Sequence, residues 1–314
     1  MNDAGVATTD VTIGAPTPVI SVKPVVLPAP GRGEDLRVRV SAPATGDELP
    51  VIVFSHGFGE SMDGYGPLVD FWTAHGFAVL QPTHLDSRTL NLAPDDPRTP
   101  LIWRFRVEDL KRVLDGLEFV EAAVPGLGGR LDRSRVAVAG HSWGAQTASM
   151  LLGARVLDSA GEPGDDMSDP RIKAGVLLAL PGTGGADLTP FAAEHFPFMN
   201  PGFAEMTTPA LVVAGDRDQS LLSVRGPDWF TDAYFLSPGG KSLLTLFGAE
   251  HSLGGISGYN VTETTDENPE RVALVRRLTW AYLRTALGLG DSTWPAARAT
   301  LAQAGDPLGR IESR

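Results

Sequence analysis

Apolar residues occur along the chain in short continuous runs that alternate with amphipathic stretches. Each run is short enough for a buried strand and is bounded by glycine, proline or polar residues. Between the runs, apolar positions recur at three- and four-residue spacing, which predicts helices, most clearly over Trp103–Ala123. This alternation is typical of an α/β fold whose mostly parallel central sheet carries helices on both faces. The runs are Val51–Phe54, Phe77–Leu80, Arg135–Ala139, Ala174–Leu180, Pro209–Ala214 and Leu243–Phe247.

The start of the chain has a different pattern. Residues 1–18 are rich in small and turn-forming types, and we expect them to form a loose arm. Val19–Val26 and Leu36–Val40 flank a turn-prone segment and predict an N-terminal antiparallel hairpin. Residues 19–290 are expected to form a single domain, and residues 291–314 a C-terminal extension. Helices are also expected at Pro67–His75, Ser142–Val156, Pro269–Leu287 and Trp294–Ala304.

Residues 182–208 fit the alternation poorly because their aromatic residues have neither helical nor strand spacing. An insertion at the carboxyl ends of parallel strands lies where open α/β sheets bind ligands. One interpretation is a short lid or acyl pocket, with Phe191, Phe196 and Phe198 binding substrate. The other is a surface loop whose aromatic rings pack on the core. Leu85–Pro100 is expected to be an irregular loop at the same edge of the sheet.

Composition excludes several functional classes. The chain has 314 residues, a formal net charge of −12 and no cysteine, so a polyanion such as nucleic acid is disfavoured and a catalytic thiol is excluded. No apolar stretch approaches the roughly 20 residues of a membrane span, and the first ten residues lack the features of a signal peptide. We therefore expect a soluble, cytoplasmic protein. No phosphate loop or dinucleotide fingerprint is present, and we expect neither an organic cofactor nor a metal.

The strongest chemical signal is Gly140-His141-Ser142-Trp143-Gly144. This G-x-S-x-G pattern directly follows an apolar strand and directly precedes a helical run, as a nucleophile elbow requires. Glycines at both ends permit the sharp turn and the close approach of strand and helix. The turn would present the Ser142 hydroxyl at the edge of the sheet, above the positive end of a helix.

A serine nucleophile needs a general base, and six histidines are available. His251 lies just past the last predicted strand, at the sheet edge expected for Ser142, and is our candidate base. His84, in the irregular loop at this edge, is the rival. His141 is expected to pack or hydrogen-bond locally within the elbow.

An acidic side chain should orient the base, and two aspartates follow the fifth parallel strand in Gly215-Asp216-Arg217-Asp218. Asp218 is favoured because the turn brings the later residue round towards the sheet edge, while Asp216 stays the alternative. An oxyanion intermediate also needs two hydrogen-bond donors. The backbone N–H of Trp143 follows the nucleophile, and that of Phe58 lies in the glycine-rich loop after the first parallel strand.

In order, these motifs read HGFG, GHSWG, GDRD and AEH, and over residues 45–290 they resemble the α/β-hydrolase superfamily. Short spacings and the N-terminal hairpin are similar to the branch of dienelactone-hydrolase-like, chlorophyllase-like, platelet-activating-factor-acetylhydrolase-like and cutinase-like esterases. Dienelactone hydrolases themselves use a cysteine nucleophile, which this chain lacks. The resemblance implies a serine hydrolase that cleaves small-molecule or polymeric carboxylic esters through an acyl-enzyme. An acyltransferase and a non-catalytic ligand-binding protein of the same fold are the alternatives, and the sequence leaves the oligomeric state open.

Charged residues crowd the start of the long predicted helix. We expect them to form a solvated face held by pairs at helical spacing, with a site for an anionic substrate as the alternative. They are Arg104, Arg106, Glu108, Asp109, Lys111 and Arg112.

Overall fold

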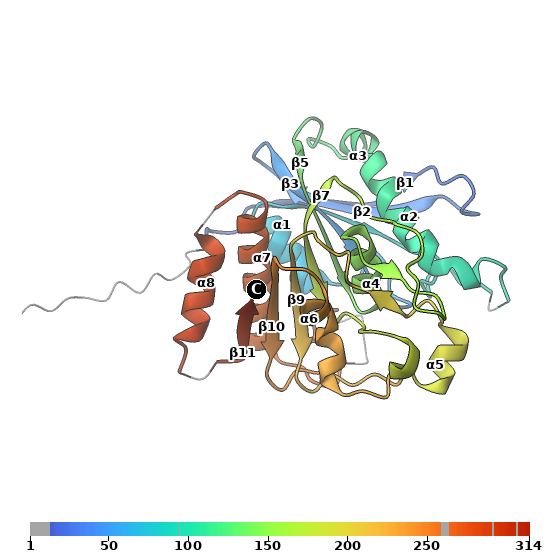
Figure 1. The fold of residues 1–314 in the computed structure, drawn as a ribbon. Coiled ribbons are helices and arrows are strands. Elements are labelled where there is room, and N and C mark those ends of the chain that lie inside the picture. Colours follow the sequence, from blue (N-terminus) through green and yellow to red (C-terminus); the bar gives the residue numbers. More distant parts are fainter. Residues whose placement is uncertain (1–12, 94, 259–263, 291, 306) are drawn as a thin grey trace, which may run out of the picture.

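The computed structural model describes residues 13–93, 95–258, 264–290, 292–305 and 307–314. Most of the predicted N-terminal arm therefore lies outside the described residues. Within them, nine strands form one sheet in the order β1-β2-β4-β3-β5-β7-β9-β10-β11 (Figure 1). These strands are β1 (Val19–Leu27), β2 (Leu36–Pro43), β3 (Leu49–Ser55), β4 (Ala78–Pro82), β5 (Leu131–His141), β7 (Ile172–Leu178), β9 (Ala210–Gly215), β10 (Lys241–Leu246) and β11 (Gly309–Ser313).

The strand directions confirm the predicted sheet. β1 and β2 pair antiparallel as the expected hairpin, and β2 runs antiparallel to β4. From β4 through β3, β5, β7 and β9 to β10, neighbouring strands are parallel, and each overlaps one of the six predicted apolar runs. The last strand, β11, was not predicted. It lies in the segment expected to be a C-terminal extension and pairs antiparallel with β10.

Helices cover both faces of the sheet, as the pattern of apolar runs predicts. α1 packs with α7 on one side, while α2 packs with α4 on the other, and α8 lies against α7 (Figure 1). In the parts of the chain that are described, no helix has the length and apolar character to cross a membrane. The helices are α1 (Gly66–Ala74), α2 (Ile102–Asp115), α3 (Leu117–Ala123), α4 (Trp143–Leu151), α5 (Pro190–His195), α6 (Asp232–Leu236), α7 (Pro269–Ala286) and α8 (Thr293–Ala302).

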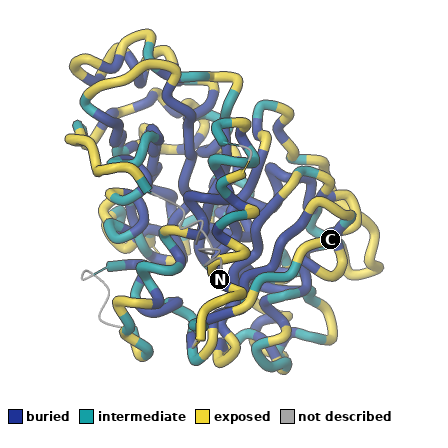
Figure 2. The backbone as a smooth tube through the Cα atoms, turned by 90° about the vertical axis from the view of Figure 1, so that its left-hand side faces the viewer, coloured by how far each residue is buried: buried dark blue, intermediate teal, exposed yellow. Residues whose placement is uncertain are grey.

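The core lies along the central strands, between the two helical layers. Every residue of β3, β4 and β9 is buried, because both faces of these strands are covered. Figure 2 shows the same distribution, with buried backbone through the interior and exposed backbone in the connecting loops. The carboxyl ends of the parallel strands meet at one edge, where loops from distant parts of the sequence come together.

Two helix predictions were wrong in extent. The helix expected over Trp103–Ala123 is two helices, α2 and α3, divided at Gly116, where a Cβ atom would lie 3.0 Å from a methyl group of Leu27. The helix expected over Ser142–Val156 ends at Leu151, because Gly153 takes a left-handed conformation with φ of 108°. Beyond it, the short strand β6 (Arg155–Val156) pairs with β8 (Pro201–Gly202).

Candidate active site

Ser142 occupies a strained turn between β5 and α4. Its φ of 55° and ψ of −122° lie in a region that L-residues rarely adopt, and its backbone N–H donates to the Leu178 carbonyl at 2.9 Å. Close packing leaves no room for side chains at the flanking glycines. A Cβ atom on Gly140 would lie 2.2 Å from the Gly144 carbonyl oxygen, and one on Gly144 would lie 2.1 Å from that of Ser55. These contacts are the local geometry that the G-x-S-x-G pattern predicts.

The structure brings Ser142, His251 and Asp218 together. His251 Nε2 lies 2.9 Å from Ser142 Oγ, and His251 Nδ1 lies 3.1 Å and 3.0 Å from the two carboxylate oxygens of Asp218. Because an ionised carboxylate only accepts hydrogen bonds, Nδ1 carries the proton and donates a hydrogen bond to Asp218. Nε2 of the neutral ring is then free to accept from the Ser142 hydroxyl. This arrangement allows His251 to take the serine proton.

Asp218 and Asp216 have different surroundings. Asp218 is fully buried, and burial raises the pKa of its carboxyl group, against the hydrogen bond from His251, which acts to lower it. Asp216 instead accepts a hydrogen bond from the Gly248 N–H at 2.7 Å. Of the two aspartates, the structure therefore places Asp218, and not the alternative, against the imidazole.

His84, the rival base, has both ring nitrogens occupied elsewhere. Nδ1 lies 3.0 Å from Asp109 Oδ2, and Nε2 lies 2.9 Å from Ser55 Oγ. These three side chains repeat the serine–histidine–aspartate order, but all are fully buried. Burial lowers the pKa of His84 and raises that of Asp109 to about 6. Because a substrate has no access to these buried side chains, we assign them a structural role in supporting the neighbouring loop.

The expectation that the charged start of the helix faces solvent was wrong for Arg106 and Asp109, which are fully buried. Arg106 pairs with Asp86 at 2.6 Å and also donates to Thr147 Oγ1 at 3.0 Å and to the His56 carbonyl. Arg106 comes four residues after the buried Ile102, so helical spacing indicated the core-facing position. A charged residue at such a position needs partners, and here they come from two distant loops and from α4.

The loop after β3 holds its backbone N–H groups in specific positions. The Gly57 N–H donates to Tyr65 Oη at 2.9 Å, and the Gly59 N–H donates to Asp86 Oδ2 at 3.0 Å. Between them, the Phe58 N–H has no acceptor among the described residues. Trp143 is the first residue of α4, so its N–H is one of those that no helix carbonyl accepts. Two backbone donors are thus present at the positions where the sequence predicts an oxyanion hole.

An apolar cleft of about 340 Å³ opens beside Ser142 and His251. The predicted substrate-binding residues Phe191, Phe196 and Phe198 all line it, whereas Phe203 of the same insertion packs in the core. The three rings thus lie where an acyl pocket would be, and Phe203 packs as the surface-loop interpretation expects. Substrate binding and a lid role stay predictions. His251 is the only ionisable side chain among the described residues that line the cleft.

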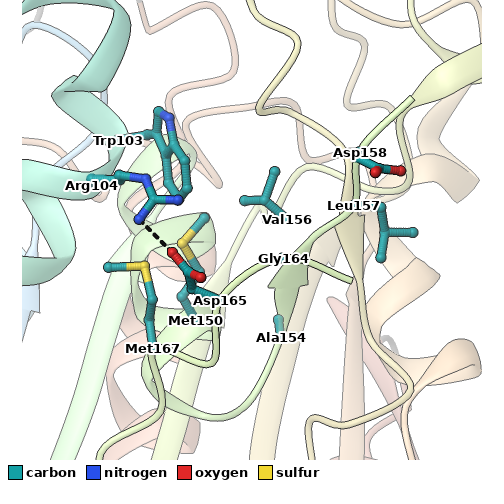
Figure 3. A pocket seen from close by; sticks show the side chains of 10 residues that line it. All are labelled: Trp103, Arg104, Met150, Ala154, Val156, Leu157, Asp158, Gly164, Asp165 and Met167. Carbon is teal, nitrogen blue, oxygen red and sulfur yellow. Dashed lines mark hydrogen bonds and ion pairs between the residues drawn. The ribbon is translucent and has the colours of Figure 1, made fainter. Parts of the chain in front are cut away.

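A second cavity, of about 200 Å³, lies beyond one wall of this cleft. Trp103 lines it together with Met150 and Met167, and the ion pair between Arg104 and Asp165 lies beside them (Figure 3). The Trp103 ring stacks on Phe198 with centroids 6.3 Å apart, and Phe198 stacks in turn on Trp143 at 5.3 Å. Stacked rings therefore separate the second cavity from the cleft beside the nucleophile.

A family model described as chlorophyllase, within the α/β-hydrolase superfamily, matches residues 22–158. The chain has the α/β-hydrolase fold. Of the branches that the sequence resembles, the match supports the chlorophyllase-like one. No curated protein matches the chain.

The family match covers less than half of the chain. It includes Phe58 and Ser142 and ends before Asp218 and His251. At the family level it supports a hydrolase that acts on esters. Specific roles for the four residues are therefore argued from the geometry of the site.

Proposed function

We propose that this α/β-hydrolase is a serine esterase that cleaves carboxylic esters through an acyl-enzyme on Ser142. The observation that carries the proposal is the hydrogen-bonded series Ser142 Oγ, His251 and Asp218, with successive contacts of 2.9 Å and 3.0 Å. A serine hydroxyl becomes a competent nucleophile when a neutral imidazole accepts its proton. The strained elbow supports the same assignment, because backbone strain in native structures concentrates at functional sites.

In the acylation half-reaction, Ser142 Oγ attacks the ester carbonyl carbon while His251 Nε2 accepts the hydroxyl proton. Asp218 stabilises the imidazolium that forms, through the Nδ1 hydrogen bond. The carbonyl oxygen becomes an oxyanion, which accepts hydrogen bonds from the backbone N–H groups of Phe58 and Trp143. Collapse of the intermediate breaks the bond to the leaving alcohol, which takes the proton from His251.

Deacylation repeats the sequence with water as the nucleophile. His251 takes a proton from the water as it attacks the acyl carbon, then returns that proton to Ser142 Oγ as the acid is released. Hydrolysis is distinguished from acyl transfer only by what attacks the acyl-enzyme. Added alcohol that is recovered as a new ester would therefore reveal transferase activity.

The cleft favours an uncharged, apolar acyl group. Apolar side chains, phenylalanines foremost among them, supply most of its lining, and burial of an acyl chain there is favourable in proportion to the apolar area covered. A carboxylate or ammonium group would be desolvated in this cleft without a fixed charge to pair with. Such substrates should be poor even where their size fits.

Hydrolysis of p-nitrophenyl esters of increasing acyl length tests the proposal, with wild type and Ser142→Ala measured together. Turnover that falls by at least about 10³-fold in the variant is expected, because the nucleophile is lost. Absence of turnover together with absence of fluorophosphonate labelling at Ser142 would favour the ligand-binding alternative.

Asp216 and Asp218 provide a matched pair of variants. Asp218→Asn should lower kcat by about 10³- to 10⁴-fold, because the amide no longer favours the productive tautomer of His251. Asp216→Asn removes a carboxylate two residues away that accepts a hydrogen bond from the Gly248 N–H. It should retain turnover close to wild type, and equal losses in the two variants would contradict the assignment.

A further inference from the structure

Two buried side chains lie between the loops that carry the proposed catalytic groups. Tyr65 is fully buried at the start of α1, and His141 is 5% exposed just before Ser142. Tyr65 has a φ of 65°, and its backbone N–H donates to the Ser257 carbonyl, in the segment that follows His251, at 2.9 Å. A non-glycine residue in this conformation is strained and needs contacts that hold it.

The protons in this region can be assigned from the groups that only accept. His141 Nε2 lies 2.8 Å from the backbone carbonyl of His251, so Nε2 carries a proton and donates it. Burial lowers the pKa of His141 to about 3, which keeps the ring neutral at neutral pH. Its Nδ1 therefore accepts, and the donor is the hydroxyl of Tyr65 at 2.9 Å.

The Tyr65 oxygen completes the series. It accepts from the Gly57 N–H at 2.9 Å while its own proton goes to His141. Burial raises the pKa of Tyr65, so the hydroxyl keeps that proton. One continuous line of hydrogen bonds thus runs from Gly57 through Tyr65 and His141 to the backbone of His251.

Each end of this line adjoins a group that the proposed function uses. Gly57 precedes the Phe58 N–H, one of the two proposed oxyanion donors, and His141 precedes the nucleophile. The other end holds the backbone of the general base itself.

We propose that Tyr65 and His141 are positioning residues that fix the oxyanion loop relative to His251 during ester turnover. The inference rests on the proposed function, which it deepens. Neither side chain lines the cleft, so neither binds the acyl group. Their loss should therefore act on the chemical step and leave substrate binding nearly unchanged.

The size of the effect follows from what is displaced. Removal of an oxyanion donor costs about 10²- to 10³-fold in kcat, and a shift of about 1 Å in a catalytic group costs up to about 10²-fold. In Tyr65→Phe the two proposed oxyanion donors remain. The Gly57 N–H, however, loses its acceptor, and His141 Nδ1 loses its donor. We expect kcat to fall by about 10- to 100-fold, with KM within about twofold of wild type.

Tyr282 supplies the matched control. It is also a buried tyrosine, 6% exposed, and its hydroxyl has no hydrogen-bond partner among the described residues. It lies on α7, where its ring packs edge-on against Trp294. Tyr282→Phe deletes the same atom from a buried ring, and we expect wild-type kcat and KM.

A second pair of variants at His141 separates positioning from packing. In His141→Gln the amide can still donate to the His251 carbonyl and accept from Tyr65, whereas His141→Leu can do neither. Rescue of kcat in the glutamine variant relative to the leucine variant is expected. Equal losses in the two would show that the volume of the side chain matters and its hydrogen bonds do not.

The experiment measures kcat and KM with p-nitrophenyl butyrate, the rate of fluorophosphonate labelling and thermal unfolding for all five proteins. Tyr65→Phe that is folded and matches Tyr282→Phe in kcat would overturn the inference while leaving the esterase intact. Loss of turnover and labelling in wild type as well would overturn the proposed function itself. If Tyr65→Phe does not fold, the His141 pair decides: equal kcat in His141→Gln and His141→Leu would overturn the inference, and a higher kcat in His141→Gln would support it.

Discussion

Replacement of Arg106 by methionine should be among the most destabilising single changes in this chain. The guanidinium group is fully buried and lies 2.6 Å from the carboxylate of Asp86, which is 2% exposed. Removal of one partner leaves the other charge buried without compensation, which costs about 3–5 kcal/mol. That is a large part of the roughly 5–15 kcal/mol by which folded proteins are stable.

The same helix provides the control, two residues earlier. Arg104 pairs with Asp165 at 2.7 Å, but the two side chains are 39% and 69% exposed. Each arginine also lies over a tryptophan ring, Arg104 over Trp103 and Arg106 over Trp143, at 4.7 Å and 4.9 Å. Arg104→Met should therefore cost only about 0–1 kcal/mol, the usual contribution of an exposed pair.

Urea unfolding at pH 7.5 measures the difference. With an m value of about 3 kcal/mol per molar, the Arg106→Met midpoint should fall by about 1–1.7 M, against at most about 0.3 M for Arg104→Met. The double variant Arg106→Met with Asp86→Asn should recover part of the loss, because the unpaired charge is removed. Equal midpoints for the two single variants would refute the argument from burial.

Lower pH offers an independent check on the cause. Burial acts to raise the pKa of Asp86, but Arg106 and His56 outweigh it, so the pKa is lowered in the wild type. Without Arg106, the effect of burial should prevail. The folded variant then binds a proton more readily than the unfolded chain. The stability that Arg106→Met loses relative to wild type should therefore shrink as the pH is lowered from 7.5 to 5. A deficit that is constant over this range would mean that lost packing, and not the buried charge, causes it.

Three further outcomes follow from the structure. Gly140→Ala should abolish esterase activity, because its Cβ would lie 2.2 Å from a backbone oxygen, whereas Gly128→Ala, with nothing within 4 Å, should retain activity; the ester assay compares them. Burial lowers the pKa of His141 to about 3 in the folded protein, against an ordinary value near 6.5 in the unfolded chain. Between these pH values the unfolded chain binds more protons, so the stability of the wild type falls as the pH is lowered. His141→Gln should lose this contribution, about 1.4 kcal/mol per pH unit, and unfolding midpoints from pH 7.5 to 5 that run parallel to wild type would contradict it. Phe198→Ala should enlarge the cleft towards Trp103 and raise kcat/KM for octanoate relative to butyrate by at least about tenfold, whereas an unchanged ratio would show that the Phe198 ring does not limit acyl length.

Local sequence patterns predicted much of the fold and the candidate site. Continuous apolar runs correspond to the parallel strands because both faces of each are covered, and the elbow is defined by five consecutive residues, Gly140–Gly144. Asp218 and His251 were predicted as candidates because carboxyl ends of parallel strands share one edge of a sheet, and the structure brings them within hydrogen-bond distance of each other. These inferences need only chain order and spacing.

Features that depend on distant partners were missed. Arg106 occupies a core-facing helical position, but the Asp86 carboxylate that pairs with it comes from a loop that has no regular spacing. Strand β11 forms only because β10 offers an edge, and the close approach of Leu27 to Gly116 comes from a strand about 90 residues earlier, a separation that helical spacing cannot register. Tyr65 gave no signal, since its role depends on a hydrogen bond to a residue 76 positions away.

The wide separation along the sequence of the groups that meet at the site has a consequence for folding. Ser142 and His251 are 109 residues apart, and their hydrogen bond needs the strands between them to be in register. Parallel sheets with such non-local pairings fold slowly, because loop-closure entropy is lost before the contacts form. Reactivity of Ser142 should therefore appear late in refolding, after secondary structure. Fluorophosphonate labelling during refolding would then report the completed native state, and not its intermediates.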